Sequence, residues 1–104
     1  MTRESLSSVT NQEIEKLKAA IVPSLKEAGV KRSAVFGSLA RGEYTSDSDV
    51  DLLIELERDK SLLDFIALKN KLEEVLKKKV DLVEYKAIKP RLKAKILEEQ
   101  IAIL

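Results

Sequence analysis

The sequence predicts an α+β fold (α/β-like) in which helices pack on a small β-sheet. Apolar residues recur at helical spacing in three segments, and short β-prone runs lie between these segments. The resulting order is α-β-(short α)-β-α-β-α, and strands interleaved with helices build a sheet covered by helices. The chain has 104 residues, about one domain's length, with no internal repeat and no interdomain linker. We therefore expect residues 1–104 to form a single domain.

The first helix is predicted to follow a loose N-terminal lead, residues 1–10, which is polar and rich in Ser and Thr. Thr10 and Glu13 have the spacing of a capping box that opens a helix. Pro23 should kink this helix or split it in two, and Gly29 is a natural stop. The apolar positions that repeat along it are Ile14, Leu17, Ile21, Leu25 and Ala28.

The first two strands are predicted at residues 33–36 and 50–56. The first run, Ser-Ala-Val-Phe, ends abruptly at Gly37. Residues 38–42 can then form a turn of helix before a polar loop at 43–48. The second run, Val-Asp-Leu-Leu-Ile-Glu-Leu, is typical of an apolar strand with acids at intervals.

A turn at 59–61 leads into a second amphipathic helix, which the lysines at 77–79 close with positive charge. Residues 80–85 alternate as a third strand, and Pro90 can occupy the first position of a last helix. The apolar end of the chain, residues 101–104, either completes the core or docks on a partner. The apolar positions of the two helices are Leu62, Phe65, Ile66, Leu68, Leu72, Val75 and Leu76, and then Leu92, Ile96, Leu97, Ile101 and Leu104.

Composition narrows the possible chemistry. Nineteen Lys and Arg residues face eighteen Asp and Glu residues, a net charge of +1, so strong direct binding of nucleic acid is not expected. The chain has no Cys and no His, which excludes thiolate nucleophiles, Ser-His-Asp triads and metal sites built on those side chains. Any bound metal should be a hard, oxygen-liganded cation such as Mg²⁺ or Mn²⁺.

The sequence also predicts where the protein works. No apolar run approaches the roughly 18 residues of a membrane span, and the N-terminus lacks the apolar stretch of a signal peptide. We therefore expect a cytoplasmic protein with no membrane contact.

Three acids are candidates for binding a metal. Asp49 and Asp51 lie two apart on a predicted strand, so both side chains should project from one face, and a divalent cation would relieve their repulsion. Asp81 begins another predicted strand among apolar neighbours, where an acid is not expected unless it is paired or liganding. Three carboxylates on one sheet face could hold two metals for phosphoryl or nucleotidyl transfer. Taken singly, each acid could instead be a solvated surface residue.

A phosphate cradle is predicted where the first strand ends. Gly37 lets the backbone approach a ligand, Ser38 offers a hydroxyl, and the N–H groups that begin the next turn can point the same way. Arg41 could neutralise a phosphate through two hydrogen bonds, or it could form a surface salt bridge to Glu43. Gly42 would free the backbone to leave the turn.

A basic cluster surrounds Pro90. It could meet phosphates or an acidic partner surface, but solvated helix charge is the favoured interpretation. Its members are Lys86, Lys89, Arg91, Lys93 and Lys95.

Together, these motifs resemble the minimal nucleotidyltransferase family of the DNA polymerase β-like nucleotidyltransferase superfamily. The resemblance rests on Gly-Ser-Leu-Ala-Arg-Gly at 37–42, Ser-Asp-Val-Asp-Leu at 48–52 and Val-Asp-Leu-Val at 80–83. It implies a mixed β-sheet flanked by helices. It also implies that members transfer AMP from ATP to a tyrosine of a HEPN-domain toxin and so act as its antitoxin.

The resemblance assigns roles to single residues. Asp49 and Asp51 would bind two Mg²⁺ ions, and Asp81, counted with the metal ligands, would be the third acid that helps to deprotonate the attacking hydroxyl. Ser38 would hold the triphosphate. The remaining nucleotide-binding candidates are Gly37, Arg41, Gly42 and Ser48.

Three functional hypotheses follow. The leading one is a Mg²⁺-dependent enzyme that transfers AMP from ATP to a HEPN partner. A binding module that neutralises a partner by forming a complex is the second, and a small-molecule nucleotidyltransferase is the third. A chain of this length has no room for a separate acceptor-binding domain, so another chain or a small molecule should supply the acceptor. A homo-oligomer is possible.

Overall fold

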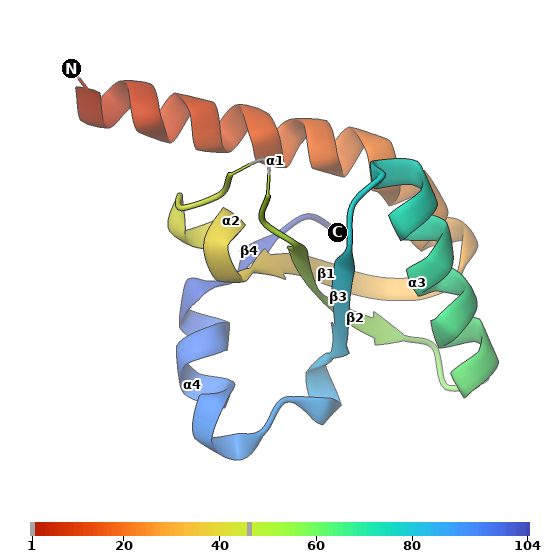
Figure 1. Ribbon diagram of the computed structural model, residues 1–104. Helices are drawn as coiled ribbons and strands as arrows, with labels where there is room; N and C mark the ends of the chain where they lie inside the picture. Colours follow the sequence, from red (N-terminus) through yellow and green to blue (C-terminus); the bar gives the residue numbers. More distant parts are fainter. Residues whose placement is uncertain (1, 46) are drawn as a thin grey trace.

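The computed structural model describes residues 2–45 and 47–104, and its centre is a four-stranded sheet in the order β3-β2-β1-β4. β1 pairs antiparallel with β2 and β4, whereas β3 runs parallel to β2. Figure 1 shows these strands at the centre of the molecule with helices around them. The α+β fold with a mixed sheet is therefore confirmed. The strands are β1 (Val30–Phe36), β2 (Val50–Leu56), β3 (Val80–Glu84) and β4 (Ile101–Ala102).

Successive side chains of β2 point to opposite faces of the sheet. Leu52 and Ile54 are buried in the main core with side chains of α1 and α3. Leu53 points the other way, where it packs with Ala34 and Ile88 beneath the partly buried residues of α4. The helices are α1 (Thr2–Glu27), α2 (Gly37–Arg41), α3 (Leu62–Leu76), the short 3₁₀ helix η1 (Tyr85–Ala87) and α4 (Pro90–Glu99).

The start of α3 follows from local sequence. Ser61 is its N-cap: the Ser61 hydroxyl accepts a hydrogen bond from the Asp64 backbone N–H at 3.4 Å, and the Asp64 carboxylate accepts one from the Ser61 N–H at 2.8 Å. This reciprocal capping box satisfies two donors that the helix cannot satisfy itself.

No helix in the described part of the chain is both long enough and apolar enough to cross a membrane.

The N-terminal region differs from expectation. The structure places α1 from Thr2 onward, so the expected loose lead is helical over 2–10, and Thr10 lies inside the helix and is not its N-cap. Met1 lies outside the described residues. No Gly or Pro precedes Pro23, and extending an existing helix costs far less than nucleating one. Pro23 does not split the helix, which runs on to Glu27.

The C-terminal region also differs. α4 ends at Glu99, and Ile101–Ala102 form a short strand against the open edge of β1, where a continuation of the last helix was expected. Ile103 is buried in the main core, and its N–H donates to the Ser33 carbonyl at 2.9 Å. Ile103 and Leu104 therefore complete the core, one of the two possibilities left open for this apolar end, whereas Ile101 and Ala102 are exposed.

Candidate active site

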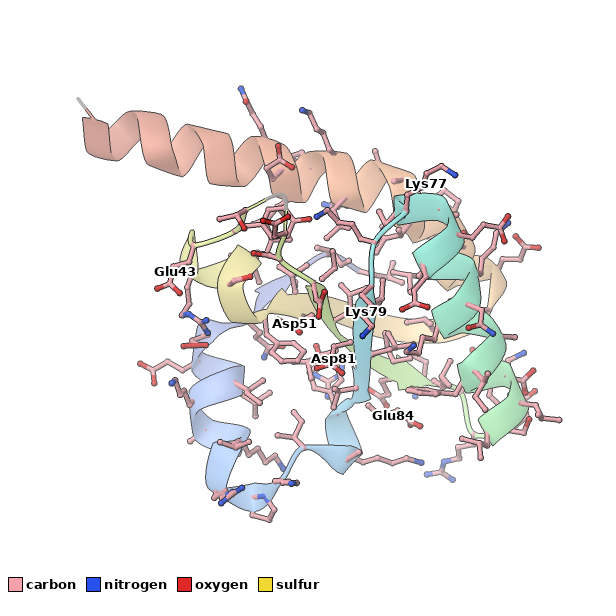
Figure 2. All side chains as sticks on the ribbon, in the orientation of Figure 1. Glu43, Asp51, Lys77, Lys79, Asp81 and Glu84 are labelled. Atoms are coloured by element: carbon pink, nitrogen blue, oxygen red, sulfur yellow. The ribbon has the colours of Figure 1, made fainter. Side chains whose placement is uncertain are left out.

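Asp51 and Asp81 face each other across the parallel pair of β2 and β3. They are register partners, and Figure 2 shows their side chains close together at the centre of the view. Neighbouring strands lie about 4.8 Å apart, so two acids in register on one face must repel each other. The predicted convergence of these two carboxylates is therefore what the structure shows.

Asp49 lies just before β2, which begins at Val50, so it is outside the strand on which it was predicted. It is exposed, yet its negative charge raises the pKa of Asp51. The three acids therefore gather at one end of β2, although only two of them are held by the sheet ladder.

The pKa of Asp51 is raised from 3.8 to about 6. Burial is the largest cause, because removing a carboxylate from water disfavours its charged form. The negative charges of Asp81 and Asp49 raise the pKa further, and the positive charge of Arg41 opposes them. A second positive charge at this point would be strongly favoured.

Gly37 brings the backbone of α2 against Asp51. Its φ of +71° is a left-handed conformation, and a Cβ built there would overlap with Oδ2 of Asp51. Only glycine fits both the conformation and the space. Ser38 follows at the start of α2, where the first backbone N–H groups have no partner within the helix.

Arg41 is ion-paired. Its Nε lies 3.0 Å from Oε1 of Glu43, and its Nη1 lies 3.5 Å from Oε2 of Glu99 in α4. The salt bridge to Glu43, the alternative left open by the sequence, is therefore present. Because Arg41 also lowers the pKa of Asp51, its charge still acts on the acidic cluster.

Gly42 and Ser48 have structural partners in the loop between α2 and β2. Gly42 caps α2 with φ +76°, and its N–H donates to the Leu39 carbonyl at 3.3 Å. The Ser48 hydroxyl accepts from the Thr45 backbone N–H at 3.0 Å. Both residues hold the backbone that leads into Asp49, and their contact with a nucleotide stays a prediction.

Two residues near the site were missed by sequence reasoning. Lys78 donates to the Ser48 carbonyl at 3.2 Å, and its Nζ lies 5.0 Å above the ring of Tyr44, so the lysine run does more than close α3. Oε2 of Glu73 accepts from the Val80 N–H at 3.0 Å, directly before Asp81. No sequence signal could find either contact, because both depend on how β3 docks beside β2.

The site suits a hard divalent cation. Its donors are carboxylate oxygens, and Asp51 is half-buried beside two like charges. Across residues 2–45 and 47–104, the acidic side chains as they stand do not form a ready-made cluster of three metal ligands. Asp49 and Asp81 are both exposed, and only Asp51 is partly buried, so the two exposed side chains are the ones with room to adjust around a metal.

Comparison with known proteins identifies the family. The nucleotidyltransferase domain model matches residues 14–103. MJ0435, a proposed protein adenylyltransferase of Methanocaldococcus jannaschii, is 48% identical over 91 residues, which are 88% of this chain and 98% of that protein. The protein adenylyltransferase MntA of Thermococcus cleftensis is 39% identical over 99 residues, covering 94% of this chain and 100% of that protein.

Solved structures agree in fold. A structure described as that of a proposed minimal nucleotidyltransferase has a TM-score of 0.75 at 39% identity, over 86% of this chain and 92% of that chain. A toxin–antitoxin structure with AMP-PNP has a TM-score of 0.72 at 20% identity, over 84% and 72% of the chains. A complex of a tri-AMPylated Shewanella oneidensis HEPN toxin with an MNT antitoxin has a TM-score of 0.68 at 17% identity, over 88% and 71%. The chain therefore belongs to the nucleotidyltransferase domain family, and within it to the minimal nucleotidyltransferases.

Proposed function

We propose that this chain transfers AMP from ATP to a tyrosine hydroxyl of a HEPN-domain protein, with Mg²⁺, and so acts in the cytoplasm as the antitoxin of that protein. The observation that supports this most directly is the register pairing of Asp51 with Asp81 beneath Gly37. This arrangement puts paired carboxylates beside a backbone turn that can receive phosphate. The relatives named protein adenylyltransferases support the choice of AMP and of a protein acceptor.

Each residue then has a task. The backbone N–H groups that begin α2 and the Ser38 hydroxyl bind the phosphates of ATP. Asp49, Asp51 and Asp81 would hold Mg²⁺, which supplies positive charge to the phosphates when bound. Arg41, oriented by Glu43 and Glu99, adds positive charge at the same end of the sheet.

The transfer is a displacement at the α-phosphorus. The tyrosine oxygen attacks the α-phosphorus as its proton passes to Asp81, which acts as general base. The new oxygen–phosphorus bond forms while the bond from the α-phosphorus to the oxygen bridging the β-phosphate breaks. Pyrophosphate leaves, and the tyrosine carries AMP.

Label transfer tests the proposal. The chain is incubated with Mg²⁺, ATP labelled at the α-phosphate and the HEPN protein encoded beside it, in parallel with the Asp49→Asn/Asp51→Asn variant. Glu74→Gln, an exposed acid on α3, is the matched control. Label on a tyrosine of the partner, from the wild type and the control only, supports the proposal.

The alternatives give different results. A stable complex without label transfer would overturn the enzymatic role and leave a non-catalytic antitoxin. Transfer to a hydroxylated small molecule, with no label on the protein, would point to a small-molecule nucleotidyltransferase.

A further inference from the structure

A groove of about 750 Å³ lies at the other end of the sheet face that carries Asp51 and Asp81. On β2, Asp51, Leu53 and Glu55 alternate onto this face, and Glu55 lines the groove. Asp51 and Glu55 are four residue steps apart along the strand, roughly 13 Å. In Figure 2, Asp81 marks the acidic end of β3 and Glu84 marks the groove end. The proposed transfer of AMP uses none of the groove's side chains.

The floor of this groove is a built structure. Nε of Arg32 lies 2.7 Å from Oε1 of Glu55, and the Arg32 guanidinium stacks 4.0 Å from the centre of the Tyr85 ring. The Tyr85 hydroxyl donates to the Gln100 side-chain oxygen at 2.9 Å. These contacts link β1, β2, η1 and the end of α4, so four elements of the fold fix the positions of the side chains in the floor.

Positive charge predominates around the floor. Two of the three lining glutamates, Glu55 and Glu84, are already paired with cations. No ion pair joins Arg58, Lys60 or Lys93 to an acid in the part of the chain that the structure describes. The charge of Lys60 already acts on Asp64 and lowers the pKa of that carboxyl, so a ligand with negative charge would find Arg58 and Lys93 as the unpaired cations of these three. The lining cations are Arg32, Arg58, Lys60, Lys86 and Lys93.

An apolar rim adjoins these cations. Leu62 lines the groove at the start of α3 and is 72% exposed. Leu63 beside it is 77% exposed, and Ile66, one turn further along, is 44% exposed. Exposure of each of these apolar side chains to water costs free energy, and a bound protein partner would remove that cost by covering them.

We propose that this basic groove, with its rim of Leu62, Leu63 and Ile66, docks the protein acceptor through an acidic segment that also carries apolar side chains. The proposal rests on the proposed function, because it assigns a second contact point to the same acceptor. Docking roughly 13 Å from Asp51 would hold the acceptor while its hydroxyl reaches Asp81. Nucleic acid suits the groove less well, because its phosphates could meet the cations but would leave the apolar rim of Leu62, Leu63 and Ile66 in water.

Charge reversal in the groove tests the docking. The variant Lys60→Glu/Lys93→Glu is compared with Lys18→Glu/Lys26→Glu, which changes the same charge on exposed positions of α1. For the groove variant we expect the KM for the acceptor protein to rise about tenfold, with kcat and the KM for ATP unchanged. The α1 variant should behave like the wild type. An unchanged acceptor KM in the groove variant would overturn the proposal.

A binding measurement separates this proposal from the catalytic one. Calorimetry of the complex between the chain and the HEPN protein, without ATP, should show the same tenfold weakening for the groove variant and for Leu62→Asp. If the wild type binds the partner but transfers no AMP, the proposed function fails while the groove can still be confirmed. If the charge reversal instead abolishes binding of a fluorescent RNA oligonucleotide and leaves partner affinity intact, the groove proposal is wrong.

Discussion

The carboxylate of Asp51 lies directly against the backbone of Gly37, so that a Cβ on Gly37 would overlap with Oδ2 of Asp51. These two residues belong to separate motifs in the sequence, the turn after β1 and the acidic start of β2. In the folded chain they form one unit, in which the position of α2 and the position of the carboxylate depend on each other.

Gly37→Ala is therefore expected to remove activity. The new methyl group must displace Asp51 or α2, and a shift of about 1 Å in such a site can cost about a hundredfold in rate. Gly29→Ala is the matched control, because Gly29 shares the left-handed backbone (φ +82°) but precedes β1, at the opposite end of that strand from Asp51. Measurement of kcat/KM for transfer checks this; equal losses in the two variants would show that backbone strain alone is responsible.

The raised pKa of Asp51, about 6, predicts that the charged carboxylate needed in the site lowers the stability of the fold. A folded-state pKa above the unfolded value of 3.8 means that the native state binds the proton more tightly. The charged carboxylate therefore destabilises the fold fully above about pH 6, and this cost disappears as the pH falls below 3.8. Because Asp51 is only half-buried, Asp51→Asn should stabilise by only about 1 kcal/mol at pH 7.

Urea unfolding in EDTA, at pH 7.5 and near pH 4, measures this effect. The gain from Asp51→Asn should be present at the higher pH and nearly absent at the lower one, while transfer activity is lost at both. A gain that is the same at both pH values would mean that packing, and not charge, is the cause.

Much of the fold was predictable because its signals are local. Strand β2 and helix α3 carry clear periodicity, and Ser61 with Asp64 marks the boundary between them. Strand β4 gave no such signal: two residues are too few for a pattern, and they pair only because β1 offers an open edge. The start of α1 was missed because polar, Ser-rich sequence can still extend a helix.

The candidate site, like the fold, was predictable from the sequence only in part. The acids and Gly37 are visible as residue types at fixed spacings, so they could be chosen from the sequence. That Asp51 and Asp81 share a register position, and that Arg41 pairs with Glu99, are consequences of how distant segments dock. No local pattern encodes such contacts.

Glu73 is expected to support Asp81 through the backbone. Its carboxylate accepts from the Val80 N–H at 3.0 Å and from Nζ of Lys69 at 3.3 Å, and the Val80 bond lowers the pKa of Glu73. Glu73→Ala should lower Tm and the protection of the Val80 amide from hydrogen exchange, whereas Glu73→Gln keeps an acceptor and should lose less.

The pH dependence of this contact has the opposite sign to that of Asp51. A lowered folded-state pKa gives stability that is present at neutral pH and is lost as the pH falls through that pKa. The difference in Tm between the wild type and Glu73→Ala should therefore shrink in acid. Glu74→Gln, an exposed neighbour on α3, should change neither Tm nor exchange; a similar loss there would mean that general helix charge is responsible.

The segment that follows α4 should matter for stability through one residue. Ile103 is only 3% exposed within the main core, whereas Ile101 in β4 is 36% exposed. Ile103→Ala removes buried methyl groups and should destabilise by about 2–4 kcal/mol, while Ile101→Ala should cost well under half of that. Urea unfolding of both variants, with equal m-values, measures the difference. If Ile101→Ala costs as much as Ile103→Ala, burial of the side chain in the main core would not explain the contribution of Ile103.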